Sequence, residues 1–114
     1  MGESVALPVM SRIARYGKLV AHEGRGAELA ELLLTAAAGL EGEPGCELYL
    51  VNRQADAPDT IWVTELWRDQ DALDAVLETI KGSPETAAAM KLVEAAEMIE
   101  LDPLGGKGPT PRVA

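Results

Sequence analysis

The sequence predicts an α+β fold in which helices cover one face of a four-stranded antiparallel sheet. Short runs of alternating apolar and polar residues predict the strands, and longer stretches with apolar residues three and four apart predict the helices. Gly- and Pro-rich breaks separate these segments. A chain of 114 residues, 47% of them hydrophobic, is long enough for one domain with a modest core.

Four runs have the composition and alternation of strands, and two of them form a predicted hairpin. The loop ADAPD, residues 55–59, joins the two runs of this antiparallel hairpin. The last run, MIEL, is short and follows a helical segment. The predicted strands are residues 14–22, 46–54, 60–67 and 98–101.

Three helical segments lie between these strands. The first begins near Ala27, and its apolar stripe comprises Leu29, Leu32, Leu33, Ala36, Ala37 and Leu40. The second is capped by Asp69 or a neighbour, and its stripe comprises Leu73, Val76, Leu77 and Ile80. The third has Ser83 as its cap and Pro84 in its first turn, and it extends to about Ala96.

This order of elements is the split β-α-β-β-α-β pattern of ferredoxin-like folds, in which one sheet face has no helices. Trp62 and Trp67 are an odd number of residues apart in one strand, so they point to opposite faces. The uncovered face carries either Trp62 and Leu66, or Ile61, Val63 and Trp67. An apolar face of this kind normally marks a protein interface, so a homodimer is expected.

Composition excludes several classes of partner. Nineteen acidic and ten basic residues give a net charge of −9, which repels nucleic acid and anionic membranes. No apolar run approaches the roughly 20 residues of a membrane span, and no secretory signal is visible. Cys46 is the only cysteine, which fits the reducing cytoplasm. We expect a flexible segment over 1–12, a domain over 13–102 and a Gly/Pro-rich tail over 103–114.

No resident cofactor is expected. One histidine and one cysteine are too few for a transition-metal site. The glycines of GRGAEL and GGKG lack the spacing of dinucleotide and phosphate-binding loops.

Glu65 and Trp67 are the candidate catalytic residues because they share a face of the predicted third strand. Trp67 is either the wall of an aromatic-binding pocket or a core residue beneath the helices. Glu65 is either a general base or the partner of Arg15 or Arg53 on a neighbouring strand.

Five further residues are candidates for contacts with a ligand. Tyr49 offers a hydroxyl to a phenolic ligand, although interface packing also explains a tyrosine here. His22 is a lesser candidate, because a lone histidine at a strand end is also typical of a solvated loop. The other three, Val63, Leu73 and Val76, supply apolar surface on the strand and the helix that follows it.

Three segments, EGEPGCELYLVNRQ, ADAPD and TELWRDQDAL, give the chain a family resemblance from about Tyr16 to Leu101. Their order and spacing resemble the antibiotic biosynthesis monooxygenase (ABM) superfamily of dimeric α/β-barrel proteins. The resemblance implies a homodimer with sheets packed face to face and a pocket between sheet and helices. It also implies cofactor-independent oxygenation of a quinol or a polyketide-like phenol, with Trp67 at the family's tryptophan.

The family pattern also separates the possible activities. Haem-degrading members use an Asn, Trp and His set, whereas Asn52 and His22 lie on predicted strands, so no haem site is expected. Many quinol-oxidising members have a histidine where this chain has Val76. The alternative function is therefore a non-catalytic ligand-binding or accessory module. A solvent-connected cavity beside Trp67 favours the enzyme, whereas a pocket filled by Leu33, Leu73 and Val76 favours the module.

Overall fold

The computed structural model describes residues 12–108. The predicted flexible segment lies outside these residues except for Arg12, and so does the tail after Gly108. Within the described range, the elements in chain order are β1 (Ile13–Ala21), α1 (Gly26–Gly39), β2 (Cys46–Gln54), β3 (Ala57–Trp67), α2 (Gln70–Ile80), α3 (Pro84–Leu92) and β4 (Val93–Leu101).

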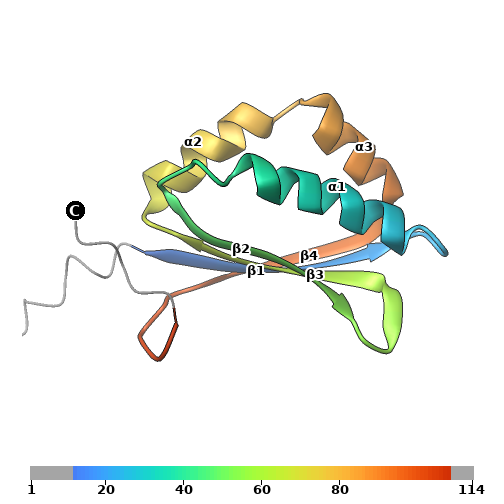
Figure 1. Cartoon of the computed structure of the whole chain (residues 1–114), viewed down its shortest axis with the longest axis horizontal. Helices are drawn as coiled ribbons and strands as arrows, with labels where there is room; N and C mark the ends of the chain where they lie inside the picture. The colour runs from blue at the N-terminus through green and yellow to red at the C-terminus, as the bar shows by residue number, and fades with distance from the viewer. Residues whose placement is uncertain (1–11, 109–114) are drawn as a thin grey trace, which may run out of the picture.

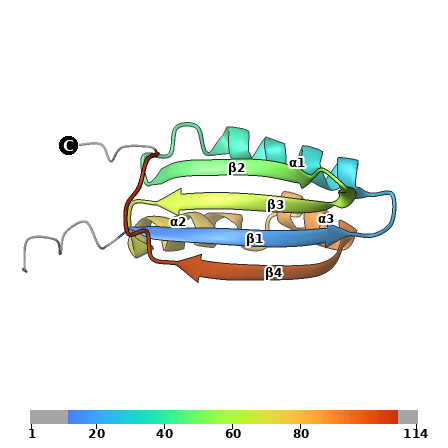
Figure 2. The same ribbon diagram turned by 90° about the horizontal axis from the view of Figure 1, so that it is seen from below.

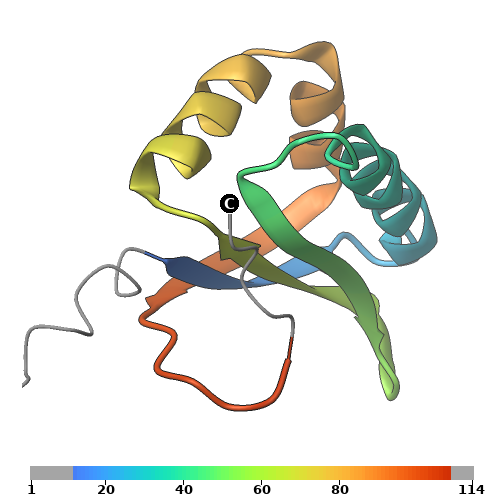
Figure 3. The same cartoon turned by 60° about the vertical axis from the view of Figure 1, so that its left-hand side comes forward.

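The strands form one antiparallel sheet in the order β2-β3-β1-β4. All of the helices lie on one side of this sheet (Figure 1). Figure 2 shows the opposite side, where the strands face the viewer without cover from a helix. In Figure 3, α3 lies beside α1 while α2 crosses above the other end of the sheet. The predicted ferredoxin-like α+β fold is confirmed.

Two boundaries differ from the sequence prediction. β3 begins at Ala57, so the hairpin connection is two residues long rather than the predicted loop 55–59. α3 ends at Leu92 rather than near Ala96, and β4 is much longer than MIEL. The residues after Leu92 pair with β1, beginning with Val93 opposite Ala21 and continuing back along β1. This long-range pairing overrides the local helix preference of Ala95 and Ala96.

The faces of β3 are now distinguished. Ile61, Val63, Glu65 and Trp67 are all buried and face the helices. One apolar cluster centres on Ile61 and Leu29 of α1, and a second joins Trp67 to Ala72 and Leu73 of α2. The uncovered face therefore carries Trp62 and Leu66. No helix in residues 12–108 is long and apolar enough to cross a membrane.

The helix starts follow the predicted caps where the sequence supplies them. The Asp69 side chain accepts a hydrogen bond from the Ala72 amide at α2, and Ser83 accepts one from Thr86 at α3. α1 has no side-chain cap of its own. Asp59 of β3 accepts hydrogen bonds from the amides of Gly24 and Gly26 across 2.9 and 2.8 Å, which holds the hairpin against the start of α1.

Candidate functional site

Four polar side chains stand side by side across the helix-facing side of the sheet, one from each strand. Tyr49 of β2 is opposite Glu65 of β3, Glu65 is opposite Arg15 of β1, and Arg15 is opposite Glu100 of β4. Paired residues of antiparallel strands project from the same face, so the four form one line. We call these residues the polar row. It crosses a face on which apolar side chains such as Ile61, Val63 and Trp67 are buried.

Glu65 is the buried centre of this row, with only 6% of its surface exposed. Its Oε1 accepts a hydrogen bond from Nε1 of Trp67 across 2.8 Å. The same oxygen lies 3.8 Å from Nη1 of Arg15, which is the ion pair that the sequence left as the alternative role of Glu65. Arg53, the other suggested partner, lies farther along β2, opposite Ile61.

Trp67 is covered rather than open. Its ring is 2% exposed and packs against Leu73, with Val76 and Cys46 beside it. Leu33 packs against the other cluster, around Leu29 and Ile61. Trp67 is therefore a core residue in this structure, and its polar edge is directed to Glu65.

Tyr49 remains a neutral phenol far above physiological pH. Its pKa is raised from 10.0 to about 12, mainly by burial and to a smaller extent by Glu65 and Cys46, while Arg15 acts in the opposite direction. At neutral pH the hydroxyl is therefore a hydrogen-bond donor and acceptor but carries no charge. It is not a base that removes a proton from a ligand.

An apolar row lies next to the polar row, two residues away along each strand and therefore on the same face. It consists of Val51, Val63, Gly17 and Met98. Gly17 has no side chain, and the thioether of Met98 lies so close that a Cβ at Gly17 would meet its Cε at 2.9 Å. Met98 is nevertheless 45% exposed, so the helices leave the β4 side of this face open.

His22 is not part of this arrangement. It follows the end of β1 that is opposite Thr60 and Val93, whereas Trp67 pairs with Ile13 at the other end. Its Nδ1 lies 3.6 Å from the Glu94 carboxylate at the surface. Glu100, which the sequence analysis did not single out, takes a place in the polar row because the register of β4 sets it opposite Arg15.

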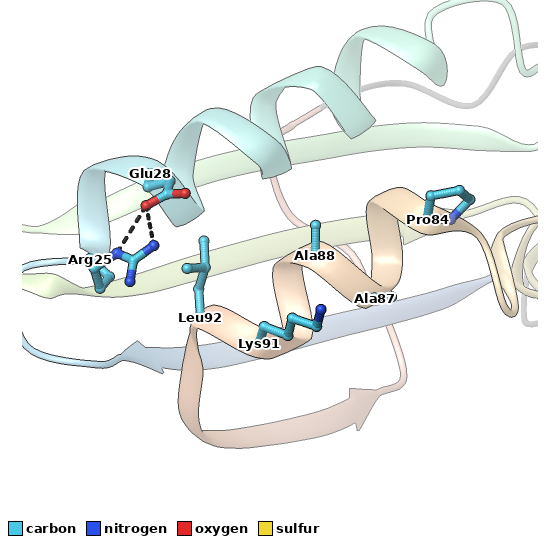
Figure 4. Close-up of a pocket in the computed structure, with 7 residues that line it drawn as sticks. All are labelled: Arg25, Glu28, Pro84, Ala87, Ala88, Lys91 and Leu92. Carbon is cyan, nitrogen blue, oxygen red and sulfur yellow. Dashed lines mark hydrogen bonds and ion pairs between the residues drawn. The ribbon is translucent and has the colours of Figure 1, made fainter.

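A groove lies elsewhere, between α1 and α3 (Figure 4). It has a volume of about 600 Å³, and its lining comprises Arg25, Glu28, Pro84, Ala87, Ala88, Lys91 and Leu92. Arg25 and Glu28 form an ion pair at its edge, 2.6 Å apart. None of the candidate site residues lines it. Within residues 12–108, no three His, Cys, Asp or Glu side chains gather as a metal site would require.

Comparison with known protein families assigns the chain to a family. The antibiotic biosynthesis monooxygenase family model matches residues 12–92, which span β1 to α3. The chain belongs to the antibiotic biosynthesis monooxygenase family. The matched region includes every member of the polar row of this ABM protein except Glu100.

Solved structures agree with this assignment. A candidate antibiotic biosynthesis monooxygenase from Chloroflexus aurantiacus J-10-fl is 31% identical, with a TM-score of 0.75 over 88% of the ABM chain described here and 100% of that chain. A second candidate from Deinococcus radiodurans is 24% identical, with a TM-score of 0.73 and coverage of 86% and 98%. SnoaB, a cofactor-independent oxygenase from Streptomyces nogalater, is 20% identical, with a TM-score of 0.73 and coverage of 84% and 96%. No curated protein sequence matches the chain.

Proposed function

We propose that this ABM protein is a cofactor-independent monooxygenase that oxidises a small hydroxylated aromatic of the quinol or polyketide-phenol type. The observation that carries the proposal is the Glu65 carboxylate, buried beneath the helices and held by Trp67 and Arg15. A fixed carboxylate beside apolar surface has the geometry required of a general base. The likeness to SnoaB, a cofactor-independent oxygenase, supports the same reaction class.

In this proposal the aromatic ring lies against the apolar row, in which Val63 of β3 is paired with Gly17 of β1 next to the polar row. Leu73 and Val76 of α2 form the opposite wall near Trp67. The phenolic hydroxyl of the ligand points to Glu65, and a second ring oxygen accepts a hydrogen bond from Tyr49. Both polar residues are neighbours on paired strands, so one small ring reaches both.

Glu65 accepts the phenolic proton, which leaves an electron-rich phenolate in a site shielded from water. The phenolate transfers an electron to molecular oxygen, and the two radicals combine to form a peroxide bond at a ring carbon that bears hydrogen. Cleavage of the oxygen–oxygen bond leaves one oxygen atom on the ring as a carbonyl and releases the other as water. One phenol and one oxygen molecule thus give one quinone and one water.

Oxygen uptake with a dihydroxynaphthalene-type substrate tests this proposal, with the purified protein and no added flavin or metal. We expect consumption above the spontaneous rate, and Glu65→Gln should lower the catalysed rate by about a hundred-fold or more because the proton acceptor is lost. Quenching of tryptophan fluorescence measures binding, which this variant should retain. Glu31→Gln, on the exposed surface of α1, removes the same charge and serves as the control. Uptake that Glu65→Gln leaves unchanged would refute the assignment of the base.

A second function is favoured by one specific observation. Trp67 is 2% exposed and Leu73 packs on it, so the space beside the indole is filled. This arrangement favours the non-catalytic binding or accessory module, because no open space for a reacting ring lies beside the indole. Binding without oxygen uptake across a panel of quinols and phenols would select this function over the monooxygenase.

We further propose that the protein works as a homodimer in the cytoplasm, with two uncovered sheet faces packed together. On this face Tyr16 stacks on Trp62 with ring centroids 5.1 Å apart, and the Lys18 ammonium lies 5.5 Å from the Trp62 ring. Large apolar side chains surround this stack and are 48% to 50% exposed in the single chain, namely Leu50, Ile99 and Leu101. A second copy that covers this surface would remove it from water.

A further inference from the structure

The guanidinium of Arg15 is buried without full satisfaction of its hydrogen bonds. Its side chain is 15% exposed, and its Nε is buried with no hydrogen-bond partner. A buried donor without a partner is costly, and a charged one more so. An unpaired donor of this kind in the middle of a candidate site indicates a place for a ligand atom.

Neither carboxylate beside Arg15 meets this need. The contact to Glu65 joins Oε1 to Nη1 at 3.8 Å, which is an ion pair longer than a hydrogen bond and does not involve Nε. Glu100 is opposite Arg15 in the β1–β4 register, and no ion pair joins the two side chains among the contacts of residues 12–108. The Nε donor therefore remains available in the line of the polar row.

We propose that Arg15 binds the ionised oxygen of the aromatic ligand, so that the site selects phenols that bind as phenolates. This inference rests on the proposed function and assigns the anion-binding group of the same site. Glu65 takes the proton from the hydroxyl, and the Nε–H of Arg15 donates a hydrogen bond to the resulting oxygen. The ligand oxygen thus lies between two residues that are direct neighbours on β1 and β3.

The charges of the two residues make them complementary for this step. Before proton transfer, Arg15 is paired with the Glu65 carboxylate. After the transfer, Glu65 is neutral and the negative charge lies on the ligand, which replaces Glu65 as the partner of Arg15. The net charge of the site is unchanged, so no additional charge is buried without a partner. Charge-assisted hydrogen bonds are also the strong ones in a buried site.

The ligand 4-nitrophenol provides a direct test because its neutral and ionised forms absorb at different wavelengths. The measurement is made slightly below the pKa of the free probe, where most of it is neutral in solution. We expect binding to wild-type protein to increase the nitrophenolate absorbance. The methyl ether 4-nitroanisole, which has no proton to lose, should bind far more weakly.

Arg15→Gln should abolish the increase in nitrophenolate absorbance and weaken binding by about ten- to hundred-fold, the range expected for a charged hydrogen bond. Arg53→Gln is the matched control, because it removes the same charge from an exposed position opposite Ile61 on the far part of the sheet. It should keep both the absorbance change and the affinity. Circular dichroism and tryptophan fluorescence establish that each variant is folded.

A wild-type measurement keeps the inference testable if Arg15→Gln does not fold. Across a series of ring-substituted phenols of similar size, affinity at one pH should rise with the acidity of the phenol. Binding of 4-nitrophenol as the neutral form, or an affinity that ignores acidity, would overturn the role of Arg15 and leave the proposed function in place. Failure of every phenol to bind would overturn the proposed function and this inference together.

Discussion

The indole Nε1–H of Trp67 donates a hydrogen bond to Oε1 of Glu65 across 2.8 Å, within the buried face of a single strand. Alternate residues of a strand share a face, so the backbone of β3 itself brings the two side chains together. A buried indole normally finds an acceptor for its N–H, and a buried carboxylate requires donors. Trp67 is thus part of the core and at the same time orients the carboxylate of the candidate site.

This contact should appear as a coupling energy between the two residues. Trp67→Phe keeps an aromatic ring but removes the donor, and we expect it to lower the free energy of unfolding by about 1–3 kcal/mol. The same change in a Glu65→Gln background should cost less, because no buried charge loses a partner. Urea denaturation of the two single variants and the double variant measures the difference. Strictly additive effects would mean that the hydrogen bond contributes no coupling.

The raised pKa of Tyr49 predicts a loss of folding stability at alkaline pH. Its pKa is about 12 in the folded chain because burial disfavours the phenolate, against an ordinary value of 10.0. A raised folded pKa gives stability that is fully present below the unfolded value and is lost as the pH rises through the folded value. The loss between these values is at most about 3 kcal/mol.

Urea denaturation at several alkaline pH values, with Tyr49→Phe as the comparison, measures this effect. The variant should lose less stability than wild type over the same interval, because it has no proton to release. Absorbance of tyrosinate should show the corresponding late titration in wild type alone. Parallel stability profiles for the two proteins would contradict the assignment to Tyr49.

The local parts of the site follow from the sequence, whereas the parts that depend on register do not. Glu65 and Trp67 are two residues apart in one strand, so the two-residue alternation of strand side chains places them on the same face. Which face of β3 meets the helices was undetermined, because Trp62 and Leu66 on one side are as apolar as Ile61 and Val63 on the other. The position of Glu100 opposite Arg15 depends on the pairing of distant segments, which no local pattern specifies.

The two misplaced boundaries have the same origin. Ala95 and Ala96 favour a helix locally, but pairing with Val20 and Leu19 of β1 places them in β4. Pro58 favours a loop, yet it lies in β3. It precedes Thr60, the first residue of β3 in chain order that pairs with β1. A proline is tolerated there because its missing N–H is not needed by that neighbour.

The lowered pKa of Asp59 predicts a loss of folding stability in acid. Hydrogen bonds from the amides of Gly24 and Gly26 hold the pKa of this carboxyl below its usual range. A lowered folded pKa gives stability that is present above the unfolded value and is lost as the pH falls through the folded one. Wild type should therefore lose thermal stability below about pH 4 more steeply than Asp59→Ala.

Asp56→Ala provides the control for that experiment. Asp56 is an exposed acid of the same hairpin, and within residues 12–108 its side chain accepts a hydrogen bond only from Gln54. Its removal should therefore leave the acid profile of wild type unchanged. At neutral pH, Asp59→Ala should have a lower melting temperature than Asp56→Ala, because only Asp59 caps α1. Equal melting temperatures for these two variants would show that the contact to Gly24 and Gly26 is dispensable.

The uncovered sheet face predicts the assembly. Light scattering should give twice the chain mass of 12.1 kDa at micromolar concentration. Leu50→Asp places a charge at a position that is 50% exposed in the single chain, so the monomer tolerates it, whereas a dimer would bury it unpaired at a cost of several kcal/mol. Leu34→Asp makes the same change on α1, where the exposed fraction is 54% and the sheet face is not involved. The first variant should dissociate and the second should not. A monodisperse monomer for wild type, or equal behaviour of the two variants, would exclude packing through the face that carries Tyr16 and Trp62.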